Sequence, residues 1–151
     1  MLARFSAFFL RRRSLVRLVT RFHMLVYRAT GGVVGGLIAG VPNLLLTTVG
    51  RKSGIQHTTP LFYLPDGDRF IVVASYGGNP NDPAWWKNLQ KNPQGWVEIG
   101  SQRMAVTAHQ ADDELKRKMW PVFVRHYPAY NDYQARTDRV IPLVVLKPEQ
   151  R

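Results

Sequence analysis

The chain of 151 residues contains no cysteine and only four histidines. Disulfide bonds, thiolate nucleophiles, iron–sulfur clusters and zinc sites that need sulfur ligands are therefore excluded. No two histidines are spaced i, i+3 or i, i+4, as a pair of metal ligands on one helix would be. We therefore expect no metal site.

Acidic residues are missing from the first 65 residues, which carry nine Lys or Arg. The other 86 residues carry 12 basic and 10 acidic side chains, so most of the net charge of +11 belongs to an N-terminal arm. A partner of negative charge is expected to meet that arm. Nucleic acid is not expected, because the rest of the chain has no distributed basic groove. The arginines of the arm are Arg4, Arg11, Arg12, Arg13, Arg17, Arg21 and Arg28.

Apolar residues of the arm recur at the spacing of one face of an α-helix. Arg13, Arg17 and Arg21 follow one another at i, i+4 and i+8, away from that face. Such an amphipathic helix either lies in a membrane interface, with its arginines near anionic headgroups, or packs on its own domain with a solvated basic face. The sequence leaves both alternatives open. The apolar stripe consists of Leu15, Leu18, Val19, Phe22, Leu25 and Val26.

Long uninterrupted hydrophobic runs are also lacking. The longest uncharged stretch, residues 29–50, is broken by glycines and Pro42, so it does not predict a membrane-spanning helix. Arginines interrupt every candidate secretory signal. We expect a basic arm with a Gly-rich linker over residues 1–41 and one domain over residues 42–151. The expected location is the cytoplasm, peripheral on the inner face of the cell membrane if the arm binds lipid.

Six short runs with the composition of β-strands follow Pro42 at hairpin-like spacing. They predict a small antiparallel barrel. Asp66-Gly67-Asp68 and Gly100-Ser101 have the composition of hairpin turns. The predicted strands are residues 44–49, 58–64, 69–74, 95–99, 103–108 and 140–146.

Two helical segments interrupt the strands. Asp82 is expected to cap the first helix, with Pro83 at its first position and the helix running over residues 84–91. Asp112 is expected to cap a second helix, and Pro128 would open a further short one. The fold class is therefore α+β, an antiparallel barrel of about six strands with inserted and C-terminal helices and an N-terminal amphipathic helix.

One strand ends in a turn that places two cations and a hydroxyl group between glycines, in the sequence Gly50-Arg51-Lys52-Ser53-Gly54. Backbone N–H groups of such a turn can also point at an anion. The turn is not a Walker A loop, because the spacer and the second glycine before the lysine are missing. It is therefore either a phosphate site or a solvated basic hairpin.

A second motif, Ser75-Tyr76-Gly77-Gly78, follows a strand with a small hydroxyl residue and two glycines. The glycines let a flat ring or a phosphate approach the backbone, and Ser75 can donate a hydrogen bond to a ring carbonyl. Taken alone, the segment is equally consistent with a loop whose glycines adopt positive φ.

Aromatic residues gather in two places. Trp85 and Trp86 lie in the first predicted helix, where indoles either wall a ligand or plug the barrel end, and one of the two is expected in the core. Tyr127, Tyr130 and Tyr133 step by three residues, which on helical geometry places three phenols on one broad face. Phenols there could cover a ring, hydrogen-bond an acceptor oxygen and donate a proton.

Together and in this order, these motifs resemble the deazaflavin-dependent nitroreductase family of actinobacteria over residues 42–148. The resemblance is carried by Leu46-Thr47-Thr48, Gly50-Arg51-Lys52-Ser53-Gly54, Thr59-Pro60-Leu61, Ala74-Ser75, Gly77-Gly78, Pro83-Ala84-Trp85-Trp86, Asn88-Leu89, Asn92-Pro93, Tyr127-Pro128, Tyr130, Tyr133, Thr137-Asp138-Arg139 and Ile141-Pro142.

The resemblance implies a split β-barrel that binds coenzyme F420, which consists of a deazaisoalloxazine ring, a phosphodiester and a polyglutamate tail. It implies that Arg51, Lys52 and Ser53 hold the phosphate and the tail. Tyr76 stands where relatives commonly carry lysine and His57 where they often carry arginine, so affinity and tail-length preference are open. The other implied cofactor residues are Thr59, Pro60, Ser75, Tyr76, Gly77, Gly78, Trp85, Trp86 and Asn88.

The activity implied by the resemblance is hydride transfer from reduced F420 to a menaquinone-like quinone or a nitroaromatic acceptor. Tyr127, Tyr130 and Tyr133 match the family positions that cover the substrate. We expect Tyr130 and Tyr133 to donate to the reacting oxygen, with Ser75 as the alternative donor.

The resemblance leaves assembly open, and two rival interpretations remain. The basic helix looks like the membrane-associated arm of this family, and related split barrels often form homodimers. One rival interpretation is a split-barrel oxidoreductase that binds FMN. The other is a non-catalytic module that binds a membrane or a polyanion through its arm.

Overall fold

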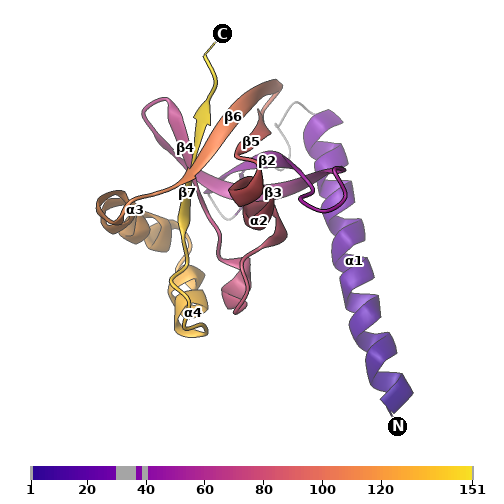
Figure 1. Ribbon diagram of the computed structural model, residues 1–151. Coiled ribbons are helices and arrows are strands. Elements are labelled where there is room, and N and C mark those ends of the chain that lie inside the picture. The colour runs from indigo at the N-terminus through magenta and orange to yellow at the C-terminus, as the bar shows by residue number, and fades with distance from the viewer. Residues whose placement is uncertain (1, 30–36, 39–40, 151) are drawn as a thin grey trace.

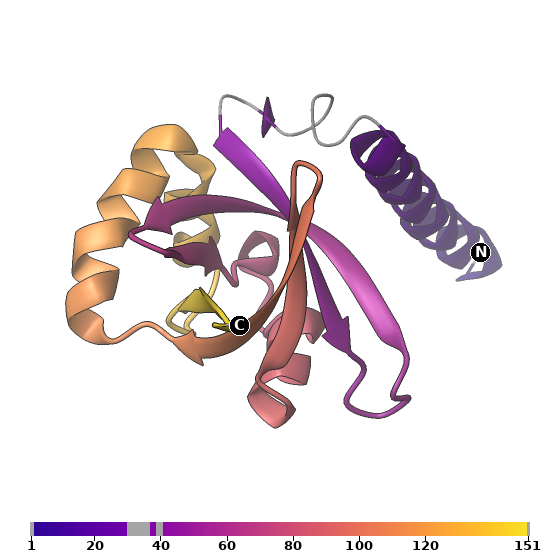
Figure 2. The ribbon, with the colours of Figure 1, turned by 90° about the horizontal axis from the view of Figure 1, so that it is seen from above.

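The structure, a computed structural model, describes residues 2–29, 37–38 and 41–150. Its centre is an antiparallel sheet with the strand order β1-β2-β3-β4-β7-β6-β5, and pairing of β2 with β5 closes β2 to β7 into a barrel (Figures 1 and 2). The strands are β1 (Leu37–Ile38), β2 (Val41–Val49), β3 (Gln56–Asp66), β4 (Arg69–Val73), β5 (Gln94–Ile99), β6 (Gln102–Gln110) and β7 (Leu143–Pro148).

The six predicted barrel strands are all present, and both predicted hairpin turns join strands. Gly67 and Gly100 have φ of 62° and 60°, the left-handed conformation that these turns require. The last strand begins at Leu143, three residues later than predicted. The reason is that the N–H of Ile141 donates to the side chain of Gln134, and Pro142 has no N–H to donate to a strand.

Alternate residues of the strands fill the barrel with aliphatic side chains, and α2 (Ala84–Lys91) packs at one end. The helix has the predicted bounds, but its N-cap prediction is wrong. Pro83 occupies the N-cap position without a side-chain cap, and Asp82 binds the guanidinium of Arg139 instead. The barrel core contains Leu44, Leu46, Val72, Ala74, Trp85, Trp86, Leu89, Val97, Val106, Ala108, Val144 and Leu146.

A second core lies outside the barrel, where α3 (Asp113–His126) and α4 (Ala129–Ala135) cover β3, β4 and β7. As predicted, Asp112 caps α3 by accepting a 2.8 Å hydrogen bond from the N–H of Leu115, and Pro128 precedes α4. Phe123 of α3 and Tyr130 of α4 are buried in this core. The two helices therefore sit against the same outer face of the barrel.

The helix α1 (Leu2–Ala29) lies on the opposite side of the barrel from α3 and α4, and it extends away from the body toward the N-terminus (Figures 1 and 2). Its last turn attaches it to the barrel. The Tyr27 hydroxyl accepts a 2.8 Å hydrogen bond from the N–H of Gly100, and the Arg28 guanidinium donates to Glu98 at 2.8 and 3.0 Å.

The apolar stripe predicted on α1 is present but not packed on the body. Five of its residues are 59–65% exposed: Leu15, Leu18, Val19, Phe22 and Leu25. No helix in the described part of the chain is long and apolar enough to span a bilayer. Most of the predicted Gly-rich linker, residues 30–36 and 39–40, lies outside the described residues.

Candidate active site

Two pockets adjoin along β3, and together they bring most of the predicted site residues to one region. Thr58 lines the first pocket and Pro60 the second, and these residues, two apart in β3, point to the same face of the sheet. The first, called the anion pocket, measures about 410 Å³ and is lined by Thr48, Gly50, Arg51, Lys52, Ser53, His57, Thr58, Thr59, Ala84, Trp85 and Asn88. The second, called the aromatic pocket, measures about 310 Å³ and is lined by Asn43, Pro60, Leu61, Phe62, Val73, Ser75, Gly77, Tyr127, Tyr130 and Tyr133.

The anion pocket is built on the turn between β2 and β3. The turn closes through two backbone hydrogen bonds, from Gly54 N–H to Gly50 O at 2.9 Å and from Gly50 N–H to Ile55 O at 2.8 Å. Gly54 has φ of 70°, which an L side chain adopts only with strain. The turn therefore presents the Arg51 and Lys52 cations and the Ser53 hydroxyl at the pocket.

Asn88 of α2 fixes the position of Arg51. The buried Asn88 Oδ1 accepts hydrogen bonds from the backbone N–H and from Nη1 of Arg51, both at 3.1 Å, and its Nδ2 donates to Thr48 Oγ1 at 3.1 Å. Both the oxygen and the nitrogen of the Asn88 amide are thus hydrogen-bonded within the protein. Asn88 orients the cation that faces the pocket.

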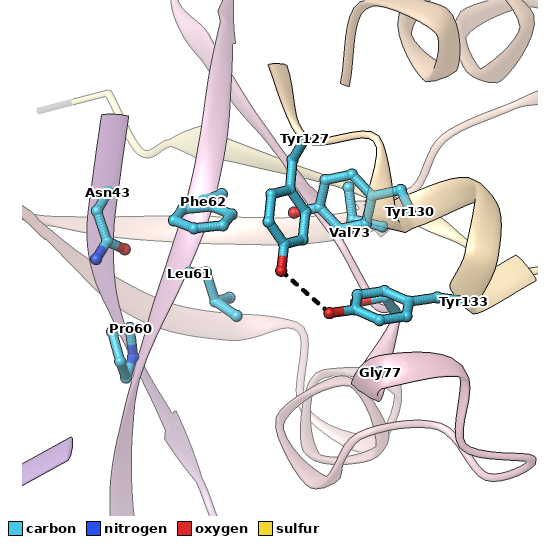
Figure 3. A pocket seen from close by; sticks show the side chains of 10 residues that line it. Asn43, Pro60, Leu61, Phe62, Val73, Gly77, Tyr127, Tyr130 and Tyr133 are labelled. Carbon is cyan, nitrogen blue, oxygen red and sulfur yellow. Dashed lines mark hydrogen bonds between the residues drawn. The ribbon is translucent and has the colours of Figure 1, made fainter. Parts of the chain in front are cut away.

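The aromatic pocket contains the three tyrosines, although they do not share one helix as predicted. Tyr127 is the C-cap of α3, whereas Tyr130 and Tyr133 belong to α4. Pro128 causes this division because it disfavours helical backbone at the residue before it. The three ring centroids still lie 5.2–6.2 Å apart, and the hydroxyls of Tyr127 and Tyr133 are 3.2 Å from each other (Figure 3).

Burial and mutual contact raise the pKa of two of these phenols, Tyr130 and Tyr133. Burial raises the pKa of Tyr130 far above its ordinary value of 10.0. The hydrogen bond with Tyr127 is the main cause that raises the pKa of Tyr133, and burial adds to it. Tyr130 and Tyr133 are therefore neutral near neutral pH, and each carries a hydroxyl proton that can be donated in a hydrogen bond.

The loop after β4 carries Ser75 and Gly77 into the aromatic pocket. Gly78 has φ of 79°, and a Cβ on it would lie 2.6 Å from the carbonyl oxygen of Tyr133, so the loop packs tightly on α4. Arg139 secures the loop from the other side. Its guanidinium donates to the carbonyl oxygens of residues 74, 75 and 79 and to the Asp82 carboxylate at 2.8–3.2 Å.

Three predicted cofactor residues lie outside the linings of these two pockets. Trp86 is buried in the barrel core, while Trp85 reaches the anion pocket. Tyr76 is 58% exposed and has φ of 47°, a strained conformation for a non-glycine residue. Gly78 serves the packing of the loop on α4.

Several pocket residues had no role assigned from the sequence, and most of them come from the paired strands β2 and β3. The register places Asn43 opposite Phe62 and Thr47 opposite Thr58. Asn43 and Phe62 stand outside every motif quoted for the resemblance, and their shared surface arises only from the pairing. The unassigned lining residues are Asn43, Thr48, Gly50, Thr58, Leu61, Phe62, Val73 and Ala84.

The family model of the F420H(2)-dependent quinone reductases matches residues 19–148. An F420H(2)-dependent quinone reductase of Mycobacterium tuberculosis is 42% identical over 130 residues, which cover 83% of this chain and 87% of the relative. The solved structure of an F420-H2 dependent reductase is 36% identical, with a TM-score of 0.64, and covers 70% of this chain and 94% of its own.

A further solved structure, described as a domain-swapped dimer, is 31% identical with a TM-score of 0.67 and covers 90% of this chain and 96% of its own. These relatives confirm the resemblance to actinobacterial F420-dependent reductases and the split-barrel fold. The chain thus belongs to the F420H(2)-dependent quinone reductase family and is an oxidoreductase whose cofactor is F420.

Proposed function

We propose that this enzyme transfers a hydride from reduced F420 to a menaquinone-like quinone held in the aromatic pocket. The observation that supports the proposal is that a cationic pocket and an aromatic pocket adjoin along one strand. A long cofactor with an anionic end and a flat ring fits such a pair of pockets. The proposal also accommodates a nitroaromatic acceptor, which needs the same donors for its oxygens.

The anion pocket has the chemistry that the phosphodiester and polyglutamate tail of F420 require. Arg51 and Lys52 supply positive charge, and Ser53, Thr58 and Thr59 supply hydroxyl groups. Arg51 is already oriented by Asn88, so little conformational entropy is lost when it binds an anion. His57 also lines this pocket, as expected from its place near the tail.

The ring of F420 would lie where the two pockets meet, beside Pro60, Ser75 and Gly77. Nothing lies within 4 Å of a Cβ built on Gly77, so that position leaves open space at the pocket. Reduced F420, when bound, supplies the hydride from its ring carbon. The protein has to orient the acceptor over the ring and hydrogen-bond the oxygen that gains charge.

The hydroxyl pair of Tyr127 and Tyr133 meets the second requirement. One hydroxyl donates to the other, which leaves the second proton of the pair for an acceptor oxygen. Tyr130 adds a third phenol to the pocket, and Ser75, which also lines it, offers an alternative donor. We therefore assign Tyr133 and Tyr130 as the donors to the acceptor oxygen.

A fluorescence titration with oxidised F420, run beside FMN at the same salt concentration, tests the cofactor site. We expect tight binding of F420 alone, and a loss of about tenfold or more in F420 affinity for Arg51→Met. Single-turnover reduction of menadione by the preloaded reduced cofactor then tests the acceptor. Preference for FMN would contradict the assignment of the anion pocket, and F420 binding without menadione reduction would contradict the assignment of the acceptor.

We further propose that α1 binds an anionic membrane surface. The five exposed apolar side chains of its stripe would enter the acyl boundary, while the exposed Arg17 and Arg21 would lie near the headgroups. Cosedimentation with phosphatidylglycerol vesicles should exceed that with phosphatidylcholine vesicles. The double variant Leu18→Asp, Phe22→Asp should abolish it and retain menadione reduction.

A second copy of the chain is the competing occupant of this stripe, since one relative is a domain-swapped dimer. Sedimentation velocity of the same variant separates the two. If the wild-type chain is a dimer that the double variant disrupts, and vesicles bind neither protein, the stripe is a subunit contact rather than a lipid-binding face.

A further inference from the structure

Asn43 differs from the other residues of the aromatic pocket because its side chain is buried with an unpaired polar atom. The residue is 3% exposed. Within the described part of the chain, its Oδ1 is the one buried side-chain nitrogen or oxygen that lacks a hydrogen-bond partner. An unpaired buried acceptor costs stability, so its presence in a pocket points to a partner supplied by a ligand.

The position of Asn43 directs its amide into the pocket. Asn43 lies opposite Phe62 in the register of β2 and β3, so both side chains are on the same face of the sheet. Figure 3 shows the oxygen of this amide on the side that faces Phe62. The backbone carbonyl of Asn43 is engaged separately, because it accepts a 3.4 Å hydrogen bond from the Tyr27 hydroxyl.

The opposite side of the aromatic pocket carries the tyrosine hydroxyls. The ring of Tyr127 packs edge-on against Phe62 at 5.4 Å between centroids, and its hydroxyl meets that of Tyr133. Figure 3 shows Phe62 and Leu61 between Asn43 and this hydroxyl pair. The pocket therefore has a polar group at each end, and the apolar side chains of Leu61 and Phe62 line it between these ends.

We propose that Asn43 hydrogen-bonds the second oxygen of a para-quinone, the one remote from the tyrosine hydroxyls; this inference rests on the proposed function. A para-quinone is a flat apolar ring with one oxygen at each end, and each oxygen accepts hydrogen bonds from polar groups such as those at the two ends of the pocket. The amide suits both redox states, because Nδ2 donates to a quinone carbonyl and Oδ1 accepts from the hydroxyl of the quinol. A nitro compound carries its oxygens on one substituent, so Asn43 favours para-quinones over nitroaromatics.

The variant Asn43→Leu, which has nearly the same shape and no polar atoms, tests the inference in the full-length protein. Calorimetric titration in the presence of oxidised F420 compares menadione with 1-tetralone, a related bicycle with one carbonyl. We expect the menadione Kd to rise about tenfold and the 1-tetralone Kd to change less than about twofold. The F420 Kd should stay the same. Gln110→Leu, on the exposed end of β6, is the control and should change none of these values.

Thermal unfolding of the ligand-free protein gives a readout that does not depend on binding. Replacing an unpaired buried amide by an apolar side chain should leave the melting temperature unchanged or raise it. A lower melting temperature with an unchanged menadione Kd would make Asn43 a packing residue and overturn the inference. If Asn43→Leu does not fold, Asn43→Ala undergoes the same titrations with the same expectations.

The remaining outcomes also decide the question. Equal weakening of menadione and 1-tetralone would indicate a general change of pocket shape, and weaker F420 binding would place Asn43 in the cofactor site; either result overturns the inference. If the wild-type protein binds F420 but not menadione, the proposed acceptor fails irrespective of the variant. The experiment thus distinguishes failure of the Asn43 inference from failure of the quinone acceptor proposal.

Discussion

The side chain of Asn88 binds Arg51 twice, through the backbone N–H and through the guanidinium, with both distances 3.1 Å. A residue of α2 thereby determines where the cation of the β2–β3 turn points. Because Asn88 is buried and also donates to Thr48, it cannot rotate away without breaking three hydrogen bonds. The geometry of the anion pocket thus depends on a residue whose own polar groups are already paired.

Asn88→Ala should weaken F420 binding about five- to tenfold and destabilise the protein by about 1–3 kcal/mol, because it releases Arg51 and leaves buried groups unpaired. Fluorescence titration and denaturant unfolding measure the two effects. Asn92→Ala, at the exposed C-cap of the same helix, is the matched control and should leave F420 affinity unchanged. Full F420 affinity in Asn88→Ala would show that the orientation of Arg51 does not matter.

Tyr133→Phe should lower kcat for menadione by about ten- to a hundredfold, because it removes one hydroxyl of the donor pair while keeping the ring. Tyr130→Phe should have a smaller effect, since Tyr130 is only 6% exposed and packs edge-on against Phe123. Steady-state kinetics at saturating reduced F420 measures both. Unchanged turnover in both variants, with a loss in Ser75→Ala, would assign the donor role to Ser75.

Menadione reduction should show no loss that is due to ionisation of Tyr130 or Tyr133 between about pH 7 and about pH 10. The pKa values of Tyr130 and Tyr133 are raised in the folded protein, the first by burial and the second by its hydrogen bond with Tyr127. Since a raised folded pKa favours the folded state, this stabilisation is complete below the ordinary pKa of 10.0 and is lost as pH rises through the folded values.

The ultraviolet absorbance of tyrosinate, followed beside the free energy of unfolding from about pH 9 to about pH 12, measures this behaviour. Part of the tyrosine absorbance should appear only as the protein unfolds. In Tyr130→Phe that delayed fraction should be smaller. Complete tyrosine ionisation in the folded protein near the ordinary pKa would contradict the burial of these phenols.

Gly77→Ala and Gly78→Ala form a matched pair that tests the loop of the aromatic pocket. Both glycines have positive φ, 61° and 79°, so both substitutions should cost about 1–2 kcal/mol of strain. Gly78→Ala should cost more and lower turnover, because its Cβ would meet the backbone of Tyr133. Chemical denaturation and menadione kinetics check this order. Equal costs would indicate that the loop can move away from α4.

Local signals in the sequence were enough to predict the barrel strands, α2 and the cap of α3. The Asp66–Gly67 turn and the Asp112 cap involve neighbouring residues only, so their chemistry can be recognised without the fold. The start of β7 could not be predicted in this way. It depends on Gln134, a helix residue that takes the N–H of Ile141 through a tertiary contact.

The candidate site likewise contains residues that could be predicted from local sequence and residues that could not. The Arg51-Lys52 turn and the three tyrosines were recognisable because their residue types and spacing already suggest anion and ring binding. Asn43 was not, since it is one polar residue beside an apolar run. Its proposed role comes from the pairing of β2 with β3, which places Asn43, with its unpaired Oδ1, beside Phe62 in the pocket lining.

Local composition and periodicity, which act over a few residues, are enough to indicate the class of this protein: a barrel without cysteine, a cationic glycine turn, a cluster of tyrosines and a basic amphipathic arm. Packing between distant residues is what brings the turn and the tyrosines together along β3, buries Trp86 in the core while Trp85 faces a pocket, and leaves the stripe of α1 exposed. Those outcomes depend on strand pairing and helix packing between residues far apart in the chain, and no local pattern encodes them.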